Sequence, residues 1–155
     1  TTRELSIRLW GSITAAPYKT PMLKDINPPK VEGMAMAVVN EADLPNGEDW
    51  VVYFINLLDQ PIESVIIRSS GFGQREGHEA KTSELRFFRQ ELPAQSYMAV
   101  EPIMAEMFDL SNEYFVTYFM GDTLYDKRYV FVPGSISDKY AVELPIVGKR
   151  GVLIK

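Results

Sequence analysis

The stretch Trp50–Ser69 constrains the fold more than any other part of this sequence. It holds two runs rich in β-branched and aromatic residues, Trp50–Leu57 and Ile62–Ser69, joined by residues 58–61. The first run is apolar at both alternating parities, which is typical of a strand covered on both faces. The second run alternates apolar and polar residues, as a half-buried strand does. The short connection contains Asp and Pro, so we expect the two strands to pair as an antiparallel hairpin.

Several other segments have strand character, and only Met104–Leu110 suggests a helical turn. We expect further strands at Glu4–Trp10, Met34–Asn40, Ser83–Gln90, Ser96–Ile103, Tyr114–Met120, Thr123–Val132, Tyr140–Val147 and Gly151–Lys155. Gly121-Asp122 fits the type II′ turn of a two-residue hairpin. Many short strands with almost no helix predict an all-β protein, a two-sheet antiparallel β-sandwich in one domain over residues 1–155. A jelly roll or a small barrel fits the same pattern.

Two segments interrupt the strands. Residues 11–33 contain four prolines and predict an irregular connection, either a crossover over one end of the sandwich or a functional arm. Residues 70–83 are rich in glycine and charge and predict a flexible surface loop. Their glycines do not match the G-x-G-x-x-G spacing and no helix pattern follows, so a glycine-rich hairpin loop is preferred to a phosphate-binding loop. Pro45-Asn46-Gly47 predicts a turn.

Composition narrows the classes of partner. The chain has 16 basic and 21 acidic residues and a net charge of -5, so a nucleic-acid partner and an anionic membrane surface are both disfavoured. No apolar run approaches the roughly 18 residues that a membrane helix needs, so no membrane insertion is expected. There is no cysteine, hence no disulfide and no thiolate metal site. A reducing, cytoplasmic compartment is consistent with this, although the start at Thr1 leaves processing open.

No catalytic constellation emerges from the sequence. His78 is the only histidine, and it is either a solvated loop residue or a base. Six carboxylates, at Glu101, Glu106, Asp109, Glu113, Asp122 and Asp126, are interpreted as surface charge, because their spacing does not establish the opposed pair of a glycosidase. We predict no catalytic residue, no metal ligand and no cofactor, and we favour a non-enzymatic protein.

Aromatic residues give the best indication of a binding surface. They occupy both parities of the segment from Tyr114 to Phe131, with Tyr118 and Phe119 on opposite faces. One face can join the core, and the other is either covered by the proline-rich connection or presented to a partner. The candidate binding residues are Tyr114, Tyr118, Phe119, Tyr125 and Tyr129, together with Phe72 and His78 of the glycine-rich segment.

The order of strands and turns between Met34 and Val132 resembles an immunoglobulin-like domain. The resemblance is carried by an N-L-x-D-x-P turn at residues 56–61 and an L-P-A-Q turn at residues 92–95, each between strands. It implies a sandwich of Greek-key strands. The Cys…Trp…Cys core of antibody domains is missing.

Phe88-Arg89-Gln90-Glu91 resembles the short F-R-x-E element of class II aminoacyl-tRNA synthetases. The chain is also similar to a family of small uncharacterised bacterial proteins, some of which are labelled phenylalanyl-tRNA synthetase. This resemblance implies that Arg89 binds an ATP phosphate beside Glu91. It covers four residues, and the glycine-rich third motif of those enzymes is absent.

Three functional hypotheses follow. The preferred one is a non-enzymatic interaction module that binds a protein partner or self-associates. The second is a small-molecule or carbohydrate binder or hydrolase on a jelly-roll-like sheet, which a pocket with two or more tyrosines and converging carboxylates would favour. The third is a translation-associated protein.

Overall fold

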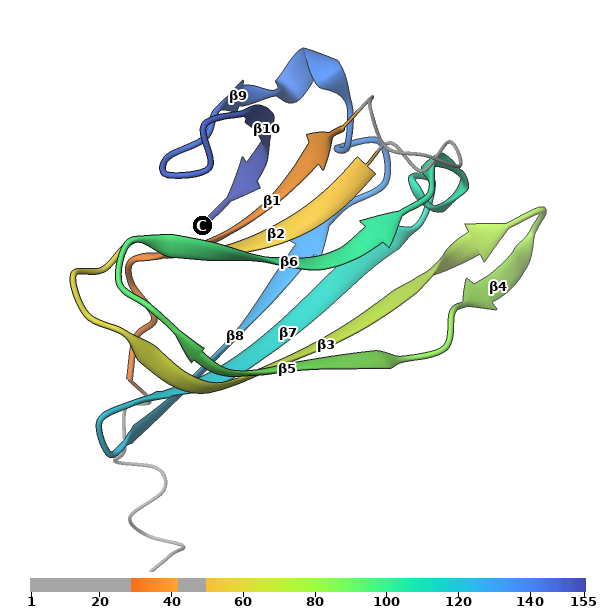
Figure 1. Ribbon diagram of the computed structural model, residues 1–155. Helices are drawn as coiled ribbons and strands as arrows, with labels where there is room; N and C mark the ends of the chain where they lie inside the picture. The colour runs from red at the N-terminus through yellow and green to blue at the C-terminus, as the bar shows by residue number, and fades with distance from the viewer. Residues whose placement is uncertain (1–28, 42–49) are drawn as a thin grey trace, which may run out of the picture.

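The computed structural model describes residues 29–41 and 50–155, which form two antiparallel β-sheets packed against each other (Figure 1). This confirms the all-β sandwich, and the two sheets are not closed into a barrel. The predicted strand Glu4–Trp10, the turn at residues 45–47 and most of the connection 11–33 lie outside the described residues.

Each sheet has five strands. Sheet A has the order β6-β2-β1-β10-β9, formed by β6 (Ser96–Ile103), β2 (Trp50–Asn56), β1 (Met34–Asn40), β10 (Arg150–Ile154) and β9 (Val142–Glu143). Sheet B is centred on β3 (Ile62–Arg75), which pairs on one side with β7 (Ser111–Met120) and on the other with β5 (Leu85–Leu92) and β4 (His78–Lys81); β8 (Thr123–Phe131) pairs with β7. Two 3-10 turns, η2 (Ala105–Met107) and η3 (Asp138–Tyr140), lie in the connections.

The strand order is immunoglobulin-like. Strands β6-β2-β1 correspond to E-B-A of that fold, and β5-β3-β7-β8 correspond to C′-C-F-G of the opposite sheet. Strands β10 and β9 extend the first sheet beyond β1.

The expected pairing of the two strands in Trp50–Ser69 is wrong. Strand β2 pairs with β1 and β6, whereas β3 lies in the opposite sheet and pairs with β4, β5 and β7. The connection between them is therefore a corner from one sheet to the other. The buried Asn56 stabilises this corner, because its amide donates to the carbonyls of Gln60 and Pro93 while its Oδ1 accepts from the Leu58 N–H. The prediction that β2 is covered on both faces is confirmed.

The glycine-rich hairpin expected at residues 70–83 is confirmed, but its arms are paired strands rather than a loop. Strand β3 continues to Arg75 and pairs with β7 as far as Phe72↔Ser111. The turn falls at Glu76 and Gly77, which have φ of 53° and 79° and so match a type I′ turn. The strand continues because Gly71 is buried and hydrogen-bonded to Thr82, so these glycines permit close packing.

Strands β1 and β6 have the predicted bounds, and the expected helical turn is the short η2. The hairpin turn at Gly121-Asp122 is confirmed, with Met120 opposite Thr123 and Gly121 at φ 63°. The predicted strand Tyr140–Val147 is mostly wrong, since only Val142–Glu143 pairs and the chain then turns at Pro145.

Two separate apolar clusters flank sheet A. The main core lies between the sheets and includes Phe54, Ile67, Tyr118 and Phe131. The second lies on the outer face of sheet A and consists of Ala35, Ala37, Val39, Val51, Tyr53, Ile55, Leu144 and Val147.

Candidate functional sites: a polar cavity and an exposed sheet face

The five predicted binding aromatics divide between the two faces of sheet B. Tyr114, Tyr118 and Tyr129 are buried between the sheets, and Tyr125 is half-buried with its ring stacked on Tyr118 at 5.2 Å between centroids. Burial raises the pKa of Tyr118 to about 12, and the charge interaction with Tyr125 adds to it. Phe119 points outward and is exposed. Four of the five candidates therefore belong to the interior of the sandwich.

The other sequence candidates are dispersed. Phe72 is exposed on the outer face of β3, and His78 is exposed on β4 opposite Arg75. Arg89 and Glu91 of the F-R-Q-E element are exposed on β5, paired with Val65 and Glu63 of β3. His78, Arg89 and Glu91 do not line the polar cavity that lies at one end of the sandwich.

A small polar cavity of about 160 Å³ lies at one end of the sandwich, where β3 and β5 diverge from β6. Its polar residues come from four segments, namely Ser69 and Ser70 of β3, Thr82 and Ser83 after β4, Glu101 of β6, and Asn112 and Tyr114 of β7. An apolar wall is made by Leu85, Pro102, Ile103, Met104 and Met107.

Glu101 is the only charged side chain that lines this cavity among the described residues. Its Oε2 accepts a hydrogen bond from the Tyr114 hydroxyl at 2.8 Å. Burial raises the pKa of the Glu101 carboxyl, and hydrogen bonds from Tyr114 and Ser69 oppose that rise only in part. Burial also raises the pKa of Tyr114, helped by the neighbouring negative charge, so Tyr114 stays a hydrogen-bond donor at neutral pH.

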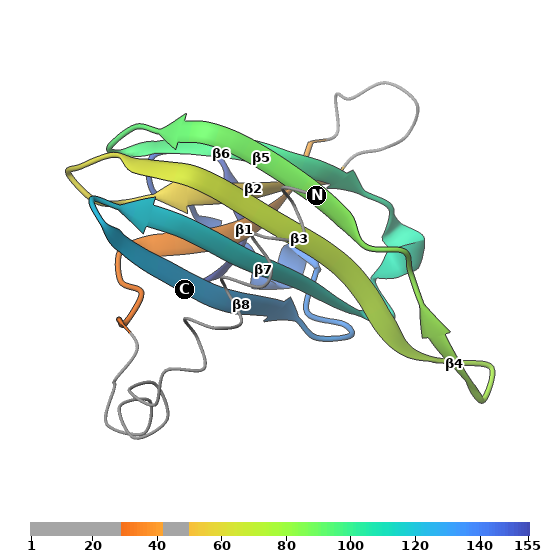
Figure 2. The same ribbon diagram turned by 90° about the horizontal axis from the view of Figure 1, so that it is seen from below.

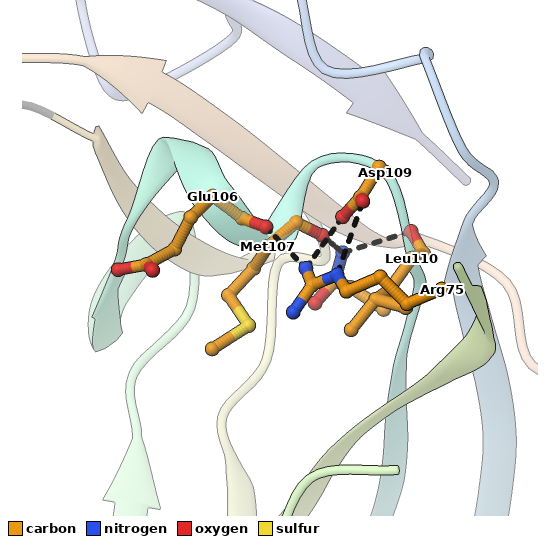
Figure 3. Close-up of polar contacts among 6 residues, drawn as sticks. Arg75, Glu106, Met107, Asp109 and Leu110 are labelled. Atoms are coloured by element: carbon orange, nitrogen blue, oxygen red, sulfur yellow. Dashed lines mark hydrogen bonds and ion pairs between the residues drawn. The ribbon is translucent and has the colours of Figure 1, made fainter. Parts of the chain in front are cut away.

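Hydrogen bonds and an ion pair from Arg75 hold η2 against the tip of the β3–β4 hairpin (Figure 3). Arg75 Nε donates to Asp109 Oδ2 at 3.1 Å, and its Nη2 donates to Asp109 Oδ1 at 2.6 Å and to the Glu106 carbonyl. The hydrogen bonds from Arg75 lower the pKa of Asp109. Asn112 adds hydrogen bonds to the carbonyls of Met107 and Leu110. Together these contacts position Met107, which forms part of the apolar wall of the cavity.

The outer face of sheet B is the second candidate site, and Figure 2 looks onto it. Side chains from all four long strands expose apolar surface there: Phe88 of β5, Ile66 of β3, Phe119 of β7 and Leu124 of β8. Phe88 is opposite Ile66, and Phe119 is opposite Leu124, one step further along the sheet. These four residues form a continuous diagonal, which we call the apolar band. Phe88, at 62% exposure, is its most exposed member.

Charges of opposite sign lie on either side of the apolar band. On one side Arg86, Arg68 and Arg128 occupy a single row with Phe115, and the Arg68 guanidinium lies 4.8 Å from the Phe115 ring centroid. On the other side Glu91 and Glu63 are paired neighbours. We call these the arginine row and the glutamate pair.

The arginine row is partly neutralised within the chain. Glu84 lies 3.7 Å from both Arg68 and Arg86, and Glu113 lies 3.5 Å from Arg128. The glutamate pair has no ion-pair partner within residues 29–41 and 50–155. The face is therefore polarised from one end to the other.

Sequence reasoning named one residue of each site, Phe119 of the apolar band and Tyr114 of the cavity, but did not identify the sites themselves. Ile66 and Phe88 stand at the polar parity of their strands, and that signal could have identified the apolar band. Glu101 appeared only as one of six scattered carboxylates. Its neighbours Ser69 and Tyr114 lie on other strands, so no local pattern connects them.

Comparisons with known proteins give no assignment: no protein-family model matches the chain, and a search of curated proteins finds no match. No described helix has the length and apolar character to cross a membrane. Within the described ranges, no three Asp, Glu or His side chains gather closely enough to hold a metal ion.

Proposed function

We propose that this protein is a non-enzymatic interaction module that self-associates through the outer face of sheet B. The observation that carries the proposal is the apolar band, to which each of the four long strands contributes one exposed large side chain. Exposed apolar side chains that are contiguous and rimmed by polar residues mark interaction sites, whereas scattered ones do not. The arginine row and the glutamate pair supply such a rim.

A second copy of the same chain is the occupant that fits this face. Consider a two-fold axis that lies in the plane of the interface and runs perpendicular to the strands. It follows the row of paired residues that contains Phe88 and Ile66. The rotation superposes this row on itself, so Phe88 and Ile66 meet their own copies in an isologous contact. It places the glutamate pair of one copy on Arg68 and Arg86 of the other. Phe119 then faces Phe115 of the second copy, so the charged pairs and these two aromatic side chains are complementary, while Leu124 faces Arg128 of the second copy.

Two contacts oppose this arrangement, that of Leu124 with Arg128 of the second copy and that of Asp126 with its own copy. Asp126 lies in the same row as Ile66, on the edge strand β8, so it would meet its own copy. The edge position leaves it exposed to water, which screens the repulsion. Removing this charge should therefore strengthen the assembly.

The size of the face predicts a weak dimer. Four strands about 4.8 Å apart and about nine residues long cover about 19 Å by 30 Å, so two such faces bury about 1,100 Å². This is the lower end of the range for specific interfaces, where complexes are transient. We therefore expect a dissociation constant in the micromolar range.

Sedimentation velocity between about 1 and 100 μM tests the proposal. The wild type should show a reversible monomer–dimer equilibrium, and Phe88→Ser should weaken it at least about tenfold, as loss of a central aromatic does. Val142→Ser on β9, which also removes an exposed apolar side chain, is the matched control and should leave the equilibrium unchanged. A wild type that stays monomeric throughout contradicts the proposal.

Charge exchange tests the orientation. The double variants Glu63→Lys/Glu91→Lys and Arg68→Glu/Arg86→Glu should each be monomeric, because each face then repels its own copy. Mixed in equal amounts they should form a heterodimer, and Asp126→Asn should tighten the wild-type dimer. If both double variants still dimerise as the wild type does, self-association is supported, but this orientation of the two copies is refuted.

A further inference from the structure

The polar cavity beside Glu101 is independent of the self-association face, because it lies between the sheets. The charge that lines the cavity is negative only. The Glu101 carboxylate lines it, while no lysine, arginine or histidine is found in its described lining. A partly buried carboxylate without a counter-charge is unfavourable. A cation that enters the cavity is therefore attracted by the carboxylate, whereas an anion is repelled.

The hydrogen bonds of the cavity leave an acceptor available. An ionised carboxylate offers about four lone-pair positions. The Tyr114 hydroxyl donates to Glu101 Oε2, and Ser69 lies close enough to lower the pKa of the Glu101 carboxyl. Thr82 Oγ1 is already engaged, since it accepts from the Gly71 N–H and donates to the Ser83 carbonyl. Glu101 is therefore the charged acceptor with spare capacity toward the cavity, beside the neutral oxygens of Ser70, Ser83 and Asn112.

The remaining lining selects among cations. Ile103, Met104 and Met107 present an apolar wall, which suits an alkyl chain. A divalent metal ion is disfavoured, because Mg²⁺ and Ca²⁺ take six or more oxygen ligands and Glu101 is the single carboxylate here. A volume of about 160 Å³ holds about five water-sized groups at about 30 Å³ each.

We infer that this cavity binds a small primary alkylammonium ion, with the ammonium group on Glu101 and the alkyl chain against Ile103 and Met107. An ammonium group has three donors and no acceptor, which suits the free lone pairs of the Glu101 carboxylate. Met104 and Leu85, both about half exposed, lie at the rim and leave the cavity open to solvent. With so few atoms the ligand is held in the millimolar to high micromolar range.

Titration of the ¹⁵N-labelled full chain with n-propylammonium chloride, at ionic strength held constant with sodium chloride, tests the inference. Saturable amide shifts are expected at Ser69, Glu101 and Asn112. The neutral analogue 1-propanol should bind at least about tenfold more weakly. The pKa of the Glu101 carboxyl, followed by ¹³C NMR, should fall when the ligand is saturating, because a neighbouring cation favours the ionised form.

Glu101→Gln should weaken n-propylammonium binding at least tenfold, while Glu143→Gln, the same change on β9, should leave it unaltered. If Glu101→Gln does not fold, Glu101→Asp replaces it, since the shorter side chain withdraws the charge from the cavity and should also weaken binding. Absence of saturable shifts overturns the inference, as do equal binding of 1-propanol and undiminished binding to the Glu101 variants.

Discussion

The outer faces of the two sheets differ in how their apolar side chains are covered. Both carry large apolar side chains that point away from the main core. On sheet A these side chains join a buried cluster with Leu144 and Val147, from the segment that follows β9. On sheet B the apolar band is exposed to solvent. We therefore expect an outward apolar side chain to belong to a binding surface only where the described residues leave it exposed.

The polar groups on the two faces strengthen this contrast. The outer face of sheet A contains the buried hydroxyl of Tyr53, which donates to Glu41, and Glu41 also accepts from Lys149 Nζ at 2.5 Å. The outer face of sheet B has charged rows exposed to water. A second core satisfies its polar groups internally, whereas an interface keeps charged groups at its rim.

Opposite faces of β7 should respond very differently to truncation. Tyr118→Ala removes a side chain that is 1% exposed in the main core, and should lower the free energy of unfolding by about 3–5 kcal/mol. Phe119→Ala, on the outward face, should change monomer stability far less and instead weaken the dimer. Urea unfolding at low protein concentration separates the two effects. Equal destabilisation by both changes would show that Phe119 has an internal structural role.

Leu144 covers the outer face of sheet A. Truncating it should lower the free energy of unfolding less than Tyr118→Ala does, but more than any substitution in the apolar band. Leu144→Ala should lower the free energy of unfolding by about 2–3 kcal/mol, because it opens a cavity over Val39 and Val51. Phe88→Ala should change the stability of the monomer by less than about 0.5 kcal/mol. Thermal unfolding of both variants at low concentration makes the comparison. Similar losses would mean that the two faces are covered alike.

A loss slightly smaller than that of Leu144→Ala, and larger than that of Phe88→Ala, is expected at Gly151, which lies close to Leu144. A Cβ there would approach the Val38 carbonyl oxygen to 2.6 Å and Leu144 Cδ1 to 3.1 Å. Gly151→Ala should therefore lower the free energy of unfolding by about 1–3 kcal/mol through overpacking. Combined with Leu144→Ala, part of the loss should be recovered, since one of the three close contacts is removed; those with the Val38 carbonyl oxygen and with Val39 Cγ2 at 3.0 Å remain. Purely additive losses would indicate that the Val38 and Val39 contacts set the cost.

Much of the fold could be predicted from the sequence, because strand alternation is a local property. Met34–Asn40 and Ser96–Ile103 have the expected bounds, and Gly121-Asp122 forms the expected hairpin turn. The pairing of β2 with β3 could not be judged locally, because a short turn serves a hairpin and a sheet-to-sheet corner alike. The distinction depends on Asn56, which reaches the Leu92 and Pro93 carbonyls on a distant segment.

The candidate sites were harder to predict than the strands. Aromatic density at residues 114–131 correctly indicated side chains on both faces, but did not show that β8 contributes Leu124 rather than a tyrosine to the outer face. The apolar band needs the registers of three strand pairs, which are long-range. The cavity depends on Glu101 meeting Tyr114 and Ser69 across the two sheets, an arrangement that follows from tertiary packing alone.

The pairing of β1 with β10 has a consequence for the order of folding. Met36 lies opposite Ile154, so sheet A joins segments from nearly opposite ends of the described chain. The strands of sheet B, by contrast, all lie between Ile62 and Phe131. Since closing a longer loop costs more entropy, sheet B can assemble early during synthesis, while β1 waits for its partner to leave the ribosome. In that interval one edge of β1 and the apolar outer surface of sheet A are open, which leaves the nascent chain prone to aggregate until β10 has paired.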